Sequence, residues 1–208
     1  MEKYVLDANL FFNMEAGLGL GDKTEAVIKN LTAIVKKLKT SKKAEFFLPP
    51  RIVTEFLSFF EEKEQPFLKD FLSAVTVKSP DVGEISFPAQ VFYGLVGDIR
   101  ERSYRGLNIG EEEIEKAGRL MQGKEGLSTK DFQIKIGGVI KKFRERYRQA
   151  TRRGFLDSLA DLDLIVLTKN LDACLVSTDE GVIYWGRMFG VKEMPAGAWK
   201  RRLDDLSS

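Results

Sequence analysis

The sequence predicts an α/β protein that is built on a small parallel sheet and carries an α-helical insertion. Short apolar, β-rich runs alternate with amphipathic helical stretches at both ends of the chain, a pattern typical of βαβ units. Between these ends, residues 87–153 carry almost no β signal. We therefore predict a sheet domain formed by residues 1–86 and 154–208, and a helical insertion at 87–153. A chain of 208 residues, 43% of them apolar, is long enough to bury the core that such a domain requires.

Apolar runs followed by polar or proline residues predict the strands. In chain order these runs are YVLDAN at 4–9, EFFLPP at 45–50, TVKSP at 76–80 and ACLVSTDEG at 173–181. Helical periodicity predicts the elements between them. In the sheet domain the helical stretches are 22–38, 51–62, 66–75, 157–172 and 181–190. Asp22 and Glu25 predict a capping box for the first of these helices, and Pro50 suits the first turn of the second.

Three helical stretches are predicted in the insertion, at 87–106, 110–123 and 128–154. The third contains Gly137 and Gly138, a pair that weakens a helix and favours a kink or a close helix crossing.

The composition excludes several classes of catalytic site. The chain has no histidine, which rules out a Ser-His-Asp triad, a Cys-His pair and histidine metal ligands. Its one cysteine, Cys174, cannot form an internal disulfide or a zinc site, and the apolar run around it favours a buried, unreactive thiol. Catalysis must therefore rely on carboxylates, amines, hydroxyls or a bound metal. No apolar stretch is long enough to span a membrane and the N-terminus does not resemble a signal peptide, so a cytoplasmic location is expected.

Four aspartates lie where a parallel α/β sheet presents groups to a ligand. Asp7 follows the first predicted strand and Asp179 follows the last. Asp157 stands at the start of a helix, and Asp161 lies one turn later on the same face. Carboxylates gathered in this way repel one another, and a divalent cation is the usual reason for such an arrangement. Oxygen ligands alone favour Mg²⁺, with Mn²⁺ as the alternative, and such an ion activates water for attack on a phosphodiester.

Each carboxylate also has a purely structural interpretation. Asp157 and Asp179 are suitable helix N-caps, and Asp161 suits the positive end of a helix dipole. Glu55, on the apolar face of its helix, is either a further metal ligand or a buried carboxylate paired with a basic residue. Three further aspartates are expected to be solvated: Asp163, Asp172 and Asp204.

A known family shares these motifs. YVLDAN, an acid in the second helix, FLDSLADLDL and LVSTDEG resemble the acidic quartet of PIN-domain metal-dependent ribonucleases. The run DSxxDxDL…LDAxLVSxDEG after a long helical insertion is similar, more narrowly, to the minimal protein-only ribonuclease P family called HARP, also known as RNA ligase partner. This resemblance covers nearly the whole chain and implies a three-layer PIN-like fold. The active-site aspartates that it implies are Asp7, Asp157, Asp161 and Asp179, with Glu55 as an additional candidate ligand.

The resemblance also implies an activity and partners. The protein would bind Mg²⁺ and remove the 5′ leader from precursor tRNA without an RNA subunit. It would also form a large homo-oligomer, built from dimers, through the helical insertion. Two alternatives stay open: a PIN ribonuclease of another kind, such as a toxin or an rRNA-processing enzyme, and a non-catalytic RNA-binding scaffold.

The last helix of the insertion is strongly basic. Residues 135–154 hold eight basic residues against one acid, and helical spacing places four of them on one stripe. These four residues, named here the basic stripe, are Lys141, Arg144, Arg148 and Arg152. A row of cations of this kind suits an RNA backbone, which is read by shape and charge. The alternative is an ordinary solvated helix face.

Overall fold

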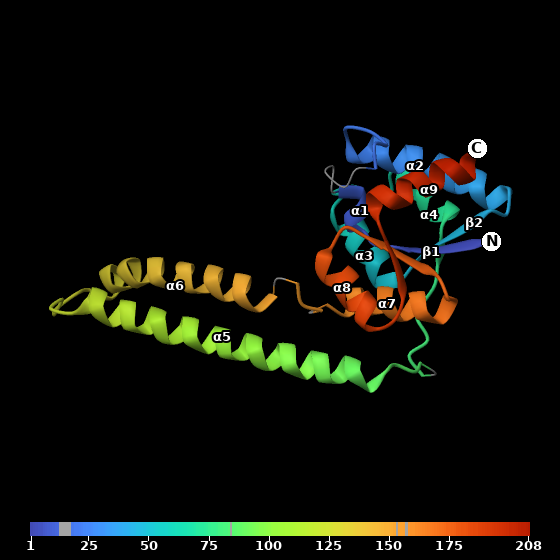
Figure 1. The fold of residues 1–208 in the computed structure, drawn as a ribbon. Coiled ribbons are helices and arrows are strands. Elements are labelled where there is room, and N and C mark those ends of the chain that lie inside the picture. The colour runs from blue at the N-terminus through green and yellow to red at the C-terminus, as the bar shows by residue number, and fades with distance from the viewer. Residues whose placement is uncertain (13–17, 84, 153, 157) are drawn as a thin grey trace. The chain divides into compact units, whose positions relative to one another are not determined.

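The computed structural model describes residues 1–12, 18–83, 85–152, 154–156 and 158–208. The chain divides into two compact units, and Figure 1 traces both. One unit, called here the sheet unit, comprises Met1–Pro88 and Leu156–Ser208. The other, called here the hairpin, comprises Ala89–Phe155.

The sheet unit confirms the predicted parallel α/β fold. Over the described ranges it contains a five-stranded sheet of order β3-β2-β1-β4-β5, in which every pairing is parallel. The central strand, β1, sets Tyr4 opposite Phe46 of β2 and Cys174 of β4. The strand bounds are β1 Glu2–Leu6, β2 Ala44–Leu48, β3 Thr76–Val77, β4 Cys174–Ser177 and β5 Lys192–Pro195.

Helices cover both faces of this sheet, which gives the unit three layers (Figure 1). Helices α2, α4 and α9 form one layer, while α7 and α8 form the other, with α3 packed beside α7. In the first layer Trp199 of α9 meets Tyr4 and Phe46 edge to face. The helix bounds are α1 Asn9–Phe12, α2 Thr24–Thr40, α3 Pro50–Ser58, α4 Pro66–Ala74, α7 Leu159–Leu171, α8 Glu180–Met188 and α9 Ala196–Ser207.

The sheet unit differs from the sequence-based prediction at two places. The capping box at Asp22 does not form, because α2 begins at Thr24 and its N-cap residue, Lys23, makes no side-chain cap. Strand β5 was not predicted, because it is a short edge strand of sequence KEMP without an apolar run. Pro50 does occupy the first turn of α3, as predicted.

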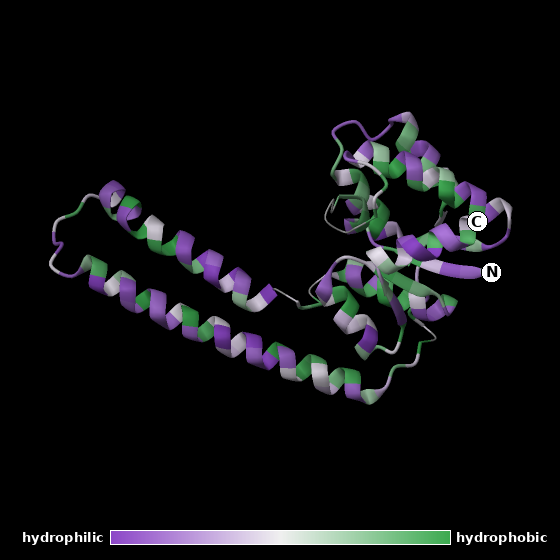
Figure 2. Ribbon diagram, turned by 45° about the horizontal axis from the view of Figure 1, so that its top comes forward, coloured by the Kyte–Doolittle hydropathy of each residue, from purple (hydrophilic) through white to green (hydrophobic). Residues whose placement is uncertain are grey.

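The hairpin consists of two antiparallel helices, α5 Ala89–Met121 and α6 Thr129–Arg152. Figure 2 shows hydrophilic and hydrophobic residues interspersed along both of them. The two stretches expected at 87–106 and 110–123 form one continuous helix. The close helix crossing lies at Gly106, where an added Cβ would come within 2.7 Å of the Tyr147 ring. Gly137 and Gly138 lie inside an uninterrupted α6, and a Cβ added to either would meet nothing described within 4 Å.

An ion cluster joins the two helices of the hairpin. Glu113 of α5 is only 3% exposed and accepts hydrogen bonds from Lys116 Nζ at 2.7 Å and Arg146 Nη1 at 2.6 Å. Arg146, on α6, also reaches Glu112 at 2.7 Å. The hydrogen bond from Lys116 and, to a smaller extent, that from Arg146 lower the pKa of the Glu113 carboxyl.

Within the described ranges, no helix combines the length and the apolar character that crossing a bilayer requires.

Candidate metal centre

The carboxyl ends of β1 and β4 bring two of the predicted aspartates together. Asp7 follows β1 directly, and its backbone N–H donates to Val176 O of β4 at 3.0 Å. Ser177 then connects the two strand ends. Its hydroxyl donates to Asp7 Oδ2, and its oxygen accepts the Asp179 backbone N–H at 2.9 Å. One buried serine therefore fixes the positions of both aspartates.

Asp7 is an almost fully buried carboxylate, with 2% of its surface exposed. Asn9 donates to it twice, from the backbone N–H at 3.2 Å and from the side-chain amide at 3.4 Å. Burial raises the pKa of Asp7, and the charge of Asp179 raises it further, while the hydrogen bonds from Ser177 and Asn9 act in the opposite direction. In the described part of the chain no cation pairs with Asp7, and its partners there are the hydrogen-bond donors Ser177 and Asn9.

Asp179 is the N-cap of α8, the structural role that the sequence also suggested for it. Its Oδ1 caps α8, accepting the backbone N–H groups of Gly181 at 2.7 Å and Val182 at 3.1 Å. No described residue donates to its Oδ2. The cap therefore orients the carboxylate and leaves one oxygen available to a ligand.

Glu55 belongs to the same electrostatic environment. Burial, and then the negative charge of Asp7, raise the pKa of the Glu55 carboxyl. No cation among the described residues pairs with this side chain. Glu55 therefore adds negative potential near Asp7, as a further oxygen ligand would.

Helix α7 brings Asp161 to the same edge of the sheet. The helix ends just before β4 begins, so its 13 residues, about 20 Å of helix, run back toward the carboxyl ends of the strands. Asp161 lies in its first turn and is half-buried. Ser158 is the N-cap of α7, its side chain accepting the Ala160 N–H at 3.0 Å. The fourth predicted aspartate, Asp157, lies outside the described residues.

An ion pair that the sequence did not reveal anchors this end of α7. Arg51, in the first turn of α3, donates to Asp163 Oδ2 at 2.7 Å. Asp163 is 7% exposed, so the expectation that it is solvated is wrong. The sequence places Arg51 directly after Pro49-Pro50, at the end of β2, but gives no indication of its partner. The pair fixes Asp163, and with it the turn that carries Asp161, to the carboxyl edge of the sheet.

The basic stripe lies in the other unit, on α6. Lys141, Arg144, Arg148 and Arg152 are all exposed. Arg146, between them in sequence, turns instead toward α5 and its glutamates. Phe143 and Tyr147, also on α6, face α5 at Gly110 and Gly106.

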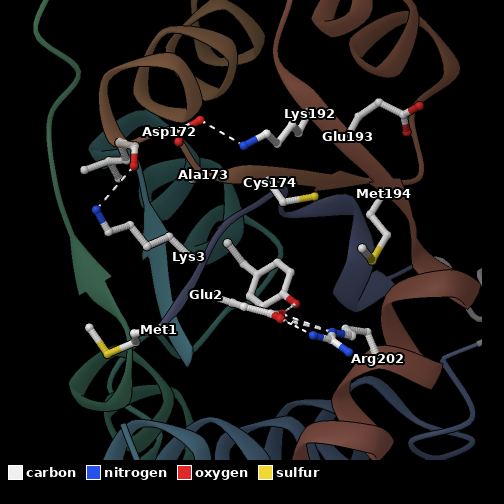
Figure 3. A pocket seen from close by; sticks show the side chains of 12 residues that line it. Met1, Glu2, Lys3, Asp172, Ala173, Cys174, Lys192, Glu193, Met194 and Arg202 are labelled. Carbon is white, nitrogen blue, oxygen red and sulfur yellow. Dashed lines mark hydrogen bonds and ion pairs between the residues drawn. The ribbon is translucent and has the colours of Figure 1, made fainter. Parts of the chain in front are cut away.

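A cavity of about 530 Å³ opens at the opposite, amino-terminal edge of the sheet (Figure 3). Several of its polar side chains are paired with one another. Glu2 binds Arg202 and accepts the Tyr4 hydroxyl, and Lys192 reaches Asp172 at 3.1 Å. Cys174 is half-buried there, and burial raises the pKa of its thiol to about 11. Glu193 Oε2 is buried there without a hydrogen-bond partner among the described residues. The cavity therefore offers an unreactive thiol and mostly paired charges, and the carboxyl edge remains the candidate site.

Comparison with known proteins identifies the family. A model of the family described as PINc domain ribonuclease matches residues 3–207. The RNA-free ribonuclease P of Thermococcus kodakarensis is 32% identical over 205 residues, which cover 98% of this chain and 95% of that protein. The bacterial RNA-free ribonuclease P of Thermodesulfovibrio yellowstonii is 33% identical, over 91% of this chain and 87% of that protein. The chain therefore belongs to the RNA-free ribonuclease P family of PINc domain ribonucleases.

Proposed function

We propose that this protein is a divalent-metal-dependent endoribonuclease that removes the 5′ leader from precursor tRNA in the cytoplasm, without an RNA subunit. The observation that carries the proposal is the serine-linked pair of Asp7 and Asp179 at the carboxyl edge of the sheet. It occurs in a chain that matches RNA-free ribonuclease P over nearly its whole length. The products would be a tRNA with a 5′ phosphate and a leader with a 3′ hydroxyl.

The side chains at this edge have the chemistry of a divalent-cation site, although no three carboxyls of the described residues are grouped closely enough to hold an ion by themselves. Burial and neighbouring negative charge raise the pKa of Asp7 and of Glu55. Asp179 has a second carboxylate oxygen, Oδ2, to which no described residue donates a hydrogen bond. All of these donors are oxygens, the ligands that Mg²⁺ and Mn²⁺ prefer. We propose Asp7, Asp157, Asp161 and Asp179 as the metal ligands, with Glu55 as an additional one. The bound cation would activate water and neutralise charge on the phosphate.

The protein's own groups supply the orientation that this chemistry needs. Ser177 and Asn9 hold the Asp7 carboxylate through three hydrogen bonds. The α8 cap fixes Asp179 in the same way. Ligands that are fixed before the substrate binds need little reorganisation during the reaction, which is the main protein contribution in sites of this type.

We assign RNA contact and self-association to the hairpin. The basic stripe offers cations to phosphates at the surface of α6. Apolar side chains are exposed along α5 as well, among them Tyr93, Val96 and Ile114. Exposed apolar residues in such number favour burial against other copies of the chain, and support a large homo-oligomer built from dimers.

Cleavage of a 5′-labelled precursor tRNA tests the proposed function. With Mg²⁺ we expect a single cut at the mature 5′ end, and with EDTA no cut. Scattered cuts, or cuts in the anticodon loop, would instead indicate a PIN ribonuclease of another kind. Binding without any cleavage would support the scaffold alternative.

The basic stripe makes a separate prediction about salt. Replacing both Arg144 and Arg148 with alanine should weaken binding of precursor tRNA and reduce the slope of log K against log salt by roughly two units at most, because each lost phosphate contact removes about one. Filter binding at several salt concentrations measures this slope. The control carries Lys37→Ala and Arg201→Ala, which remove two exposed cations from the sheet unit. An unchanged slope for the Arg144 and Arg148 variant would remove these residues from the RNA interface.

A further inference from the structure

A second cavity opens beside the candidate metal centre. It has a volume of about 390 Å³ and is lined by Asn9, Phe12, Thr178 and Asp179. Two of these residues belong to the site itself, because Asn9 donates to Asp7 and Asp179 is a proposed ligand. Phe12 is the apolar member of the described lining. An aromatic ring is thus placed next to the carboxylates, in a space large enough for one nucleotide.

The Phe12 ring is held in place by other rings. Phe59 lies 4.1 Å away at an interplanar angle of 32°, and Phe60 and Phe56 lie at 5.8 and 6.0 Å. Phe56 is fully buried, so the cluster is anchored in the core of the sheet unit. At its outer side, Phe59 is 53% exposed. Phe12 is therefore a rigid, half-buried aromatic ring at the edge of the cavity.

A nuclease that cuts at the start of a tRNA must hold a nucleotide on each side of the cut phosphate. The first mature nucleotide is base-paired in the acceptor stem, whereas the leader before it is single-stranded. An unpaired base can turn out of its stack and lie against an aromatic ring, and this contact tolerates any base identity. A ring of this kind suits an enzyme whose substrates carry leaders of different sequence.

We propose that Phe12, supported by Phe59, stacks against the base of the last leader nucleotide and so positions the phosphate to be cut. This inference rests on the proposed function and adds a substrate contact to it. Because stacking uses the face of the ring, an aliphatic side chain of similar volume cannot replace it, and a larger aromatic side chain can.

Cleavage of matched substrates tests the contact. The wild type and Phe12→Leu are compared on a precursor tRNA and on the same RNA with an abasic site at the last leader position. Removing the base should lower kcat/KM of the wild type about tenfold, as should Phe12→Leu on the normal RNA. The two losses should not add, because they remove the same contact. Phe12→Trp should keep wild-type activity, and the control Phe87→Leu, a half-buried ring that contacts Phe189 outside this cluster, should have no effect.

Fluorescence of 2-aminopurine at the last leader position, measured in EDTA, gives a readout that does not depend on cleavage. The wild type and Phe12→Trp should quench it, and Phe12→Leu should not. Losses in kcat/KM that add, or equal quenching by the wild type and Phe12→Leu, would overturn the stacking contact. Absence of correct cleavage with normal quenching would instead contradict the proposed function and leave the stacking contact supported.

Discussion

Asp7→Asn is expected to lower the rate of precursor tRNA cleavage by about 100-fold or more. Loss of a group that only orients a metal ligand typically costs 10- to 100-fold, so loss of a proposed ligand should cost at least the upper part of that range. The fold should survive, because asparagine keeps an oxygen that can accept from Asn9 and removes a buried charge. Single-turnover cleavage, RNA binding and thermal unfolding are measured together.

Asp172→Asn is the matched control for this substitution. Asp172 is exposed at the amino-terminal edge of the sheet, where it ends α7 in the left-handed region at φ 45°, a conformation that asparagine tolerates well. This variant should cleave at the wild-type rate. Wild-type cleavage by Asp7→Asn would remove Asp7 from the metal site. Unfolding of Asp7→Asn would instead make Asp7 a structural residue.

Trp199→Ala is expected to cost about 3–5 kcal/mol of unfolding free energy, as truncation of a large buried side chain usually does. Trp199 is fully buried, with ring contacts to Tyr4 at 6.0 Å and to Phe46 at 6.3 Å, so its loss would detach α9 from β1 and β2. The loss is a large fraction of the stability of a typical domain. Urea unfolding followed by circular dichroism measures it.

Trp199→Phe separates packing from hydrogen bonding at the same position. The indole N–H of Trp199 is buried and has no hydrogen-bond partner among the described residues. Phenylalanine keeps most of the ring contact and removes this unpaired donor, so it should cost much less than alanine. Equal losses for the two variants would mean that packing against Tyr4 and Phe46 does not hold α9.

The parallel fold could be predicted because its inner strands are apolar on both faces. YVL, EFFL and CLV are short β-rich runs, and each lies in a strand of the sheet. Edge strand β5 could not be found in this way. It is only partly buried, and its sequence, KEMP, mixes charged and apolar residues. The continuity of α5 could not be predicted either, because a glycine often marks the end of a helix. Gly106 instead lies inside α5, where the absence of a side chain makes room for the Tyr147 ring.

The candidate site was predictable only in part. A short motif such as YVLDAN or LVSTDEG shows that an aspartate follows a strand. These two motifs were enough to predict that Asp7 and Asp179 lie at the carboxyl edge of the sheet. The partner of Asp163 could not be predicted, because Arg51 is 112 residues away in sequence. Phe12 gave no signal either, since an aromatic residue after an apolar strand is typical of a core. Its exposure beside the carboxylates is a property of the folded chain.

The position of a bound cation tests the central claim most directly. Crystals grown with Mn²⁺ would show the ion by anomalous scattering, and the account predicts density within about 2.5 Å of carboxylate oxygens of Asp7 and Asp179. Asp7→Asn crystals treated in the same way should lose most of that density. Density only at the amino-terminal edge, near Glu2 and Glu193, or none at saturating Mn²⁺, would contradict a metal-dependent nuclease site at the carboxyl ends of β1 and β4.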